Sequence, residues 1–158
     1  MVLKLWMALY GMIWIVFLEF LLAMTPVADP TLLIYAHIAL GVVIVGLAFY
    51  NFNGVRRTAV PARIKRIANS TFSLSVLMVI LGLLVFFDVG KDWVIPLLNL
   101  SIYGILLFFH VVNAFAIITQ AAAVAIAYDM WEEKEFAQET EPGSVPTRPM
   151  PKAANPKT

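Results

Sequence analysis

The sequence predicts an all-α membrane protein, a four-transmembrane-helix bundle with both termini cytoplasmic. Of its 158 residues, 61% are hydrophobic and only 13% are charged, which is far more apolar than a soluble domain. The apolar residues gather in four long stretches separated by short polar loops. A bilayer-spanning helix needs about 20 apolar residues, with about 17 as the lower limit. The four stretches therefore predict four spanning helices.

The stretches differ in how closely they match the length of a span. The first two, Leu5–Met24 and 31–50, match it directly. The third, 72–87, reaches the required length when the small polar residues just before it are included. The fourth, 97–128, is longer than a bilayer requires, so this helix must tilt or protrude. Pro96 suits the first turn of the fourth helix.

The start of the chain resembles a signal peptide, because Lys4 precedes an apolar run. The run is longer than a usual signal core, it contains Glu19, and no small-residue cleavage site follows it. We therefore expect the first stretch to remain in the protein as a spanning helix.

Positive charge predicts the orientation in the membrane. The loop 51–66 contains five basic residues, whereas the first loop has none and the third has only Lys91 between two aspartates. By the positive-inside rule, loop 51–66 and both termini are cytoplasmic in a multi-pass protein of the cell membrane. The second half of this loop, 61–70, is expected to lie along the lipid headgroups with Ile64 and Ile67 facing the acyl chains.

The composition changes abruptly after the fourth stretch, which divides the chain into a transmembrane domain, 1–130, and a cytoplasmic tail, 131–158. The tail begins with charged residues that continue the fourth helix, and from position 141 it is rich in proline and expected to be largely extended. The absence of cysteine excludes disulfides and thiolate metal sites. A net charge of +1 gives no support for nucleic acid as a partner.

The two histidines of the chain, His37 and His110, each lie inside a long apolar stretch. An ionisable side chain in the hydrocarbon layer is costly, so it is usually paired, ligated or placed on a polar path. Imidazole is also a ligand of haem iron. One histidine in each of two spans, with none in the loops, is the pattern that a single bis-histidine haem requires.

Glu19 is expected to face His37. Both residues lie roughly 8–9 Å below the outer surface, counting about 1.5 Å per residue along antiparallel helices joined by a short turn. Glu19 is then able to accept a hydrogen bond from one ring nitrogen of His37 and leave the other nitrogen free as a ligand.

The depth of His110 has two solutions. If aromatic residues near position 130 mark the inner interface, His110 lies near the depth of His37, and one cofactor fits between the two helices. If Trp93 marks the outer interface, His110 lies roughly 20 Å deep, and a shared cofactor is awkward.

Small residues follow each histidine by one helical turn, Gly41 after His37 and Ala114 after His110. They leave room for either a macrocycle or another helix. Asn113 is placed to hydrogen-bond His110 or a neighbouring carbonyl. Without a cofactor, His37 would be a structural partner of Glu19, and His110 would bond Asn113 or Ser75.

The segments HIALG, which starts at His37, and FFHVVNAF, which contains His110, resemble those of the small four-helix b-type cytochrome subunits that anchor or serve respiratory complexes. The resemblance implies haem b with these two histidines as axial ligands. It also implies electron transfer to or from quinone, or electron relay into a larger assembly.

Two main hypotheses of function follow. The first is a haem b-binding integral-membrane subunit that relays electrons within a multi-subunit complex and is itself non-catalytic. The second is a cofactor-free accessory subunit, whose partners are other integral-membrane subunits and lipid. A proton or ion conduit using Glu19 and His37, and a non-haem metal site formed by these residues with His110, are further chemical options.

Overall fold

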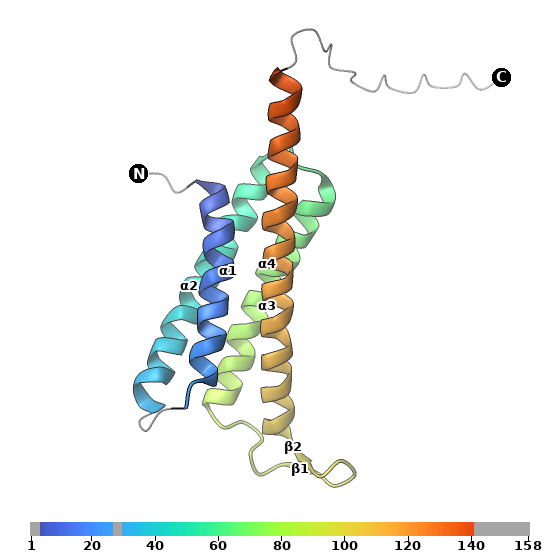
Figure 1. Ribbon diagram of the computed structural model, residues 1–158. Coiled ribbons are helices and arrows are strands. Elements are labelled where there is room, and N and C mark those ends of the chain that lie inside the picture. Colours follow the sequence, from blue (N-terminus) through green and yellow to red (C-terminus); the bar gives the residue numbers. More distant parts are fainter. Residues whose placement is uncertain (1–3, 27–29, 141–158) are drawn as a thin grey trace, which may run out of the picture.

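The computed structural model describes residues 4–26 and 30–140 and contains four long helices (Figure 1). A short antiparallel pair of strands, β1 and β2, joins the third helix to the fourth. Each helix is long and apolar enough to cross a membrane, which confirms the prediction of four such segments. The elements are α1 (Leu5–Met24), α2 (Pro30–Arg57), α3 (Ala62–Phe86), β1 (Val94–Ile95), β2 (Leu100–Ser101) and α4 (Ile102–Thr140).

The helices form a four-membered ring. Their main contacts are α1 with α2, α2 with α3, α3 with α4, and α4 with α1, so α2 and α4 face each other across the bundle. The start of α1, the α2–α3 loop and the end of α4 lie at one end, here called the basic-loop end (Figure 1). The opposite end, where α1 stops and the β1–β2 hairpin lies, is called the hairpin end.

The expectation that 61–70 lies along the headgroups is wrong, because this segment is the beginning of α3. Ile64 is buried in the core, and Ile67 packs against the same cluster. Ile64 and Ala68 are one helical turn apart, so both face the bundle when the segment is helical. Burial against the other helices therefore wins over an interfacial position.

The start of the fourth helix also differs from the expectation. Pro96 lies in the turn between β1 and β2, where the N–H of Leu98 donates to the carbonyl of Ile95 at 3.1 Å. Proline suits this second position of a turn, and α4 begins six residues later, at Ile102. At its other end α4 continues through the charged segment to Thr140 and extends past the other helices (Figure 1). The Pro-rich part of the predicted tail, 141–158, lies outside the described residues.

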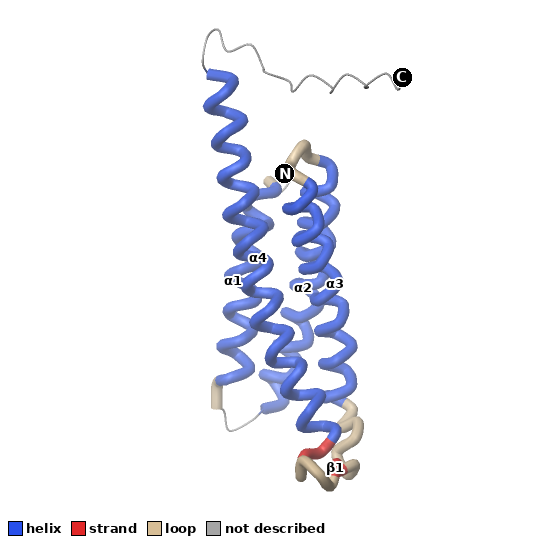
Figure 2. The backbone as a smooth tube through the Cα atoms, turned by 90° about the vertical axis from the view of Figure 1, so that its right-hand side faces the viewer, coloured by secondary structure: helices blue, strands red, loops and turns tan. Residues whose placement is uncertain are grey.

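The packed core fills only part of the bundle. One buried apolar cluster lies at the basic-loop end, and a second lies in the middle. Within the described residues, the buried apolar side chains of the second cluster nearest the hairpin end are Val16, Ile44 and Ile117. Past that level the α1–α2 pair and the α3–α4 pair lie apart (Figure 2).

Candidate functional site

Residues from all four helices meet just beyond the last apolar layer of the core. They are Glu19 of α1, His37 of α2, Gly82 of α3 and His110 of α4, and we call them the histidine layer. His37 contacts Glu19 and lies beside His110, while Gly82 faces the His110 ring. The layer therefore joins the two helix pairs at the level where their shared apolar core ends.

The expected contact between Glu19 and His37 is present. Nδ1 of His37 lies 2.8 Å from Oε1 of Glu19, and the glutamate is only 9% exposed. The two atoms are in close polar contact, although the ring N–H does not point at the carboxylate oxygen as a hydrogen bond requires. Within the described part of the chain, Oε2 of Glu19 is buried and has no hydrogen-bond partner. His37 is thus the group that compensates this buried carboxyl.

The rings of His37 and His110 have centroids 6.0 Å apart and planes inclined by 53°. This separation places His110 at the level of His37, the first of the two solutions. The count from Trp93 gave a greater depth because it assumed a helix from that residue, whereas α4 begins only at Ile102. Nδ1 of His37 faces Glu19, which leaves Nε2 of that ring outside this contact. Nδ1 of His110 is buried and has no hydrogen-bond partner among the described residues.

Asn113 and Ser75 were the residues expected to hydrogen-bond the ring of His110, but each donates to a backbone carbonyl instead. Nδ2 of Asn113 donates to the carbonyl of Leu74 at 2.9 Å, which ties α4 to α3 one turn from His110. Oγ of Ser75 donates to the carbonyl of Thr71 within α3 at 2.9 Å. Asn113 therefore takes the neighbouring-carbonyl alternative, and it holds the helix of His110 rather than its ring.

The small residues have different surroundings. A Cβ at Gly41 would meet no atom within 4 Å, so the space one turn from His37 is open. Ala114, one turn from His110, is half-buried. Further along the same face of α4, Ala121 and Ala125 are buried in the core and serve helix packing.

Gly82 was not singled out from the sequence, although it is part of the layer. A Cβ at this position would lie 3.2 Å from Cε1 of His110, tighter than most such contacts. The glycine sits in an apolar run with no polar neighbour, so the sequence around it gives no functional pattern. The signal that could have identified Gly82 was its position near one end of the third apolar stretch. It lies four residues before Phe86, the last residue of α3.

The spacing of the two histidine rings is compatible with ligation of one haem iron. Metal–imidazole bonds of about 2.0–2.1 Å on both sides of one metal, plus the distance from each nitrogen to its ring centre, separate two ring centroids by about 6 Å. The observed 6.0 Å is compatible with this arrangement, and it also lies within the 5.1–6.4 Å range of the direct ring contacts elsewhere in the bundle. The buried Nδ1 of His110 lies on the side of the ring that faces Gly82 of α3, so its missing partner gives no evidence for a metal between the rings.

An open pocket of about 420 Å³ lies beside His37, between the ends of α1 and α2. His110 does not line this pocket, so the pocket lies on the α1–α2 side of His37 and not between the two rings. Within the described residues, no group of three or more His, Cys, Asp or Glu side chains is arranged for a metal ion. The three-ligand non-haem site of Glu19, His37 and His110 is therefore not formed, whereas a haem needs only two protein ligands.

Comparisons with protein-family models, curated proteins and solved structures return no match for this chain.

Proposed function

We propose that this chain is a haem b-binding integral-membrane subunit that relays electrons within a multi-subunit membrane complex and is itself non-catalytic. The observation that carries the proposal is the approach of His37 and His110 across the bundle, with ring centroids 6.0 Å apart. Two imidazoles from opposite helices at this spacing are suited to axial ligation of one iron. The chain has only these two histidines, so it holds a single haem of this kind.

The residues of the layer have separate roles in this proposal. Haem supplies a one-electron couple when bound. His37 and His110 would be its ligands, and Glu19, which lies 2.8 Å from Nδ1 of His37, would hold the ring proton on Nδ1 and leave Nε2 to bind. Gly41 leaves open space one turn from His37, Ala114 is the small residue one turn from His110, and Asn113 fixes α4 against α3.

The proposal includes a location and an orientation. The bundle spans the cell membrane with loop 51–66 and both termini in the cytoplasm, since this loop holds five basic residues. The hairpin end then faces the outer side, and the histidine layer lies nearer to that side. Other integral-membrane subunits, lipid and quinone are the proposed partners, and nucleic acid is not one of them.

The alternative is a cofactor-free accessory subunit of a larger membrane complex. The observation that favours it is that His37 directly contacts both Glu19 and His110. Glu19 already pairs with His37, and the two imidazole rings pack at a tilt. These contacts compensate part of the cost of burying the polar groups without any cofactor.

A difference spectrum separates the two functions. The full chain is purified, together with its native complex where possible, and a dithionite-reduced minus air-oxidised visible spectrum is recorded. A sharp α-band in the b-type region supports the haem subunit. A flat difference spectrum contradicts it and leaves the accessory subunit.

A further inference from the structure

The connection between α3 and α4, residues 88–101, exposes large apolar side chains. Leu97, at the tip of its turn, is 92% exposed, and Trp93 is 71% exposed. Leu98, next in the turn, is also exposed. Turn tips that face water usually contain Gly, Asn, Asp or Ser, which suit tight turns and water. Here the tip is Pro-Leu-Leu, and its apolar surface requires a covering.

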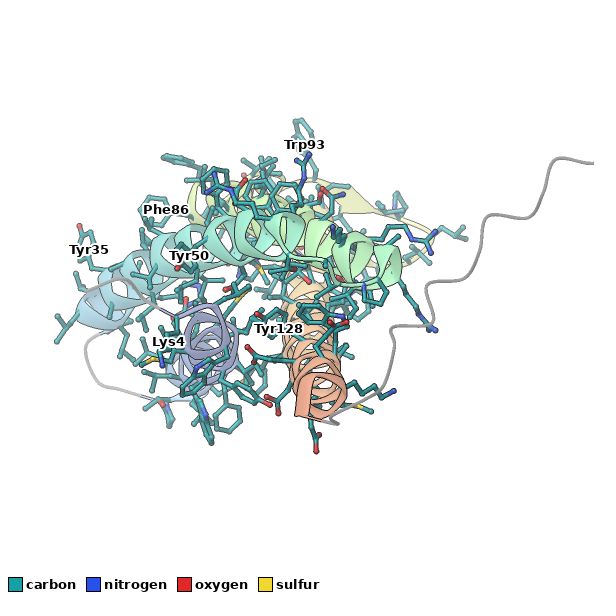
Figure 3. All side chains as sticks on the ribbon, turned by 90° about the horizontal axis from the view of Figure 1, so that it is seen from above. Lys4, Tyr35, Tyr50, Phe86, Trp93 and Tyr128 are labelled. Carbon is teal, nitrogen blue, oxygen red and sulfur yellow. The ribbon has the colours of Figure 1, made fainter. Side chains whose placement is uncertain are left out.

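The backbone of the hairpin is fixed, so the tip does not fold back onto the bundle. The N–H of Ile102 donates to the carbonyl of Trp93 at 2.8 Å, and the N–H of Tyr103 donates to the carbonyl of Gly90 at 3.3 Å. Gly90 has a φ of 73°, and a Cβ there would collide with Ile102. These contacts hold the tip outside the helix ring, and Figure 3 shows Trp93 pointing away from the bundle.

The polar part of the connection lies before the apolar tip. Nζ of Lys91 donates to Oδ2 of Asp88 at 3.1 Å, and this carboxylate raises the pKa of the lysine. Both side chains are exposed. The hairpin thus has a charged part that suits water and an apolar part that does not.

The level of the hairpin identifies what covers its tip. Counting about 1.5 Å per residue from the histidine layer, Met24 and Pro30 lie roughly 7–10 Å away, at the ends of α1 and α2. By the same count, Phe86 and Ile102 lie roughly 6–12 Å away. The hairpin therefore leaves the bundle at the level where the apolar helices end, which is the membrane boundary.

We infer that the outer-leaflet lipid covers this tip, with Trp93, Leu97 and Leu98 inserted at the boundary between headgroups and acyl chains. Tryptophan favours that boundary, and the exposed Phe86 and Phe87 connect the tip to the apolar outer surface of α3. Asp88 and Lys91 stay at the water side. The inference rests on the membrane placement proposed above and is independent of haem.

Site-directed spin labelling tests the inference, and the chain is suited to it because it contains no cysteine. Single variants Leu97→Cys, Lys91→Cys and Ile80→Cys of the full chain are labelled and reconstituted into phosphatidylcholine–phosphatidylglycerol vesicles. Collision rates are then measured with oxygen, which concentrates in hydrocarbon, and with a nickel chelate, which stays in water. Lys91 is the matched control in the same hairpin, and Ile80 is an exposed residue within α3.

We expect an oxygen-to-nickel collision ratio severalfold higher at Leu97 than at Lys91, and highest at Ile80. A Leu97 label that is as accessible to nickel as the Lys91 label would place the tip in water and overturn the inference. Protection of Leu97 from both reagents would also overturn it, because protein would then cover the tip. Nickel access at Ile80 would instead contradict the membrane placement itself.

Discussion

The imidazole of His110 lies over Gly82 of the neighbouring helix α3, where a Cβ would be 3.2 Å from its Cε1 atom. Because α3 presents no side chain here, the ring occupies the interior of the bundle and reaches His37 of the opposite helix. A larger residue at position 82 would fill the same space. The approach of the two histidines thus depends on a residue that does no chemistry.

Removing either histidine should abolish the low-spin haem spectrum, because each is expected to supply one axial ligand. His37→Ala and His110→Ala are compared with the unchanged chain by visible and electron paramagnetic resonance spectroscopy. Addition of free imidazole should partly restore the signal of His37→Ala, since the side chain of His37 is 36% exposed and its place is reachable. A normal low-spin spectrum in either variant rules out bis-histidine ligation within this chain.

Glu19→Gln should retain haem but raise its reduction potential. A carboxylate at Nδ1 increases the basicity of a ligand histidine and so favours ferric iron. Without the carboxylate the ferric state is less stable relative to the ferrous state, and the potential rises. The rise is roughly 60 mV for each tenfold change in the relative stability of the two oxidation states. A redox titration followed at the α-band measures it.

The matched control for this titration is Asp129→Asn, since Asp129 accepts a hydrogen bond from Tyr10 at 3.4 Å, far along α4 from the layer. This variant also removes one carboxylate, and its potential should remain unchanged. Equal shifts in both variants would mean that Glu19 acts only through the overall charge of the protein.

Gly82→Ala should be less stable than Gly46→Ala. Alanine is favoured over glycine in a helix by about 0.5–1 kcal/mol at either site. At Gly46 a Cβ meets no atom within 4 Å, whereas at Gly82 it presses on His110. Overpacking of this kind costs about 1–3 kcal/mol. Thermal unfolding in one detergent compares the two variants, and equal stabilities would show that the ring moves away without cost.

The number of helices and the pairing of Glu19 with His37 were predictable, because both depend on local rules. Apolar length indicates four helices, and a short turn between antiparallel helices sets two residues at one depth. Equal depth makes the contact at 2.8 Å possible, and the packing of α1 against α2 turns the two side chains toward each other.

The remaining features depend on tertiary packing that the sequence does not express. The depth of His110 stayed open because α4 is longer than a span, and only its packing against α3 fixes its position along the bundle. The start of α3 was predicted as a surface segment because it contains several basic residues. Ile64 and Ala68 nevertheless form a buried face of the helix. Pro96 suits a helix start and a turn equally well, and the β1–β2 pairing selects the turn.

Asn113→Leu should destabilise the bundle and disturb the haem site, although Asn113 touches neither histidine ring in a hydrogen bond. Its Nδ2 donates to the carbonyl of Leu74 at 2.9 Å and is the polar tie between α3 and α4 nearest to His110. Hydrogen bonds between helices in membranes average about 0.6 kcal/mol, with about 1.7 kcal/mol as the maximum. The loss should lower the midpoint of thermal unfolding and broaden the low-spin resonance signal, because α4 then holds His110 less rigidly.

The matched control is Thr119→Val, since Oγ1 of Thr119 bonds the carbonyl of Phe115 within α4 and ties no second helix. This change should leave both the unfolding midpoint and the resonance signal as they are. If Asn113→Leu lowers the midpoint but keeps a sharp resonance signal, the hydrogen bond stabilises the bundle without positioning His110. That result would remove Asn113 from the haem site and leave the position of His110 to its contacts with Gly82 and His37.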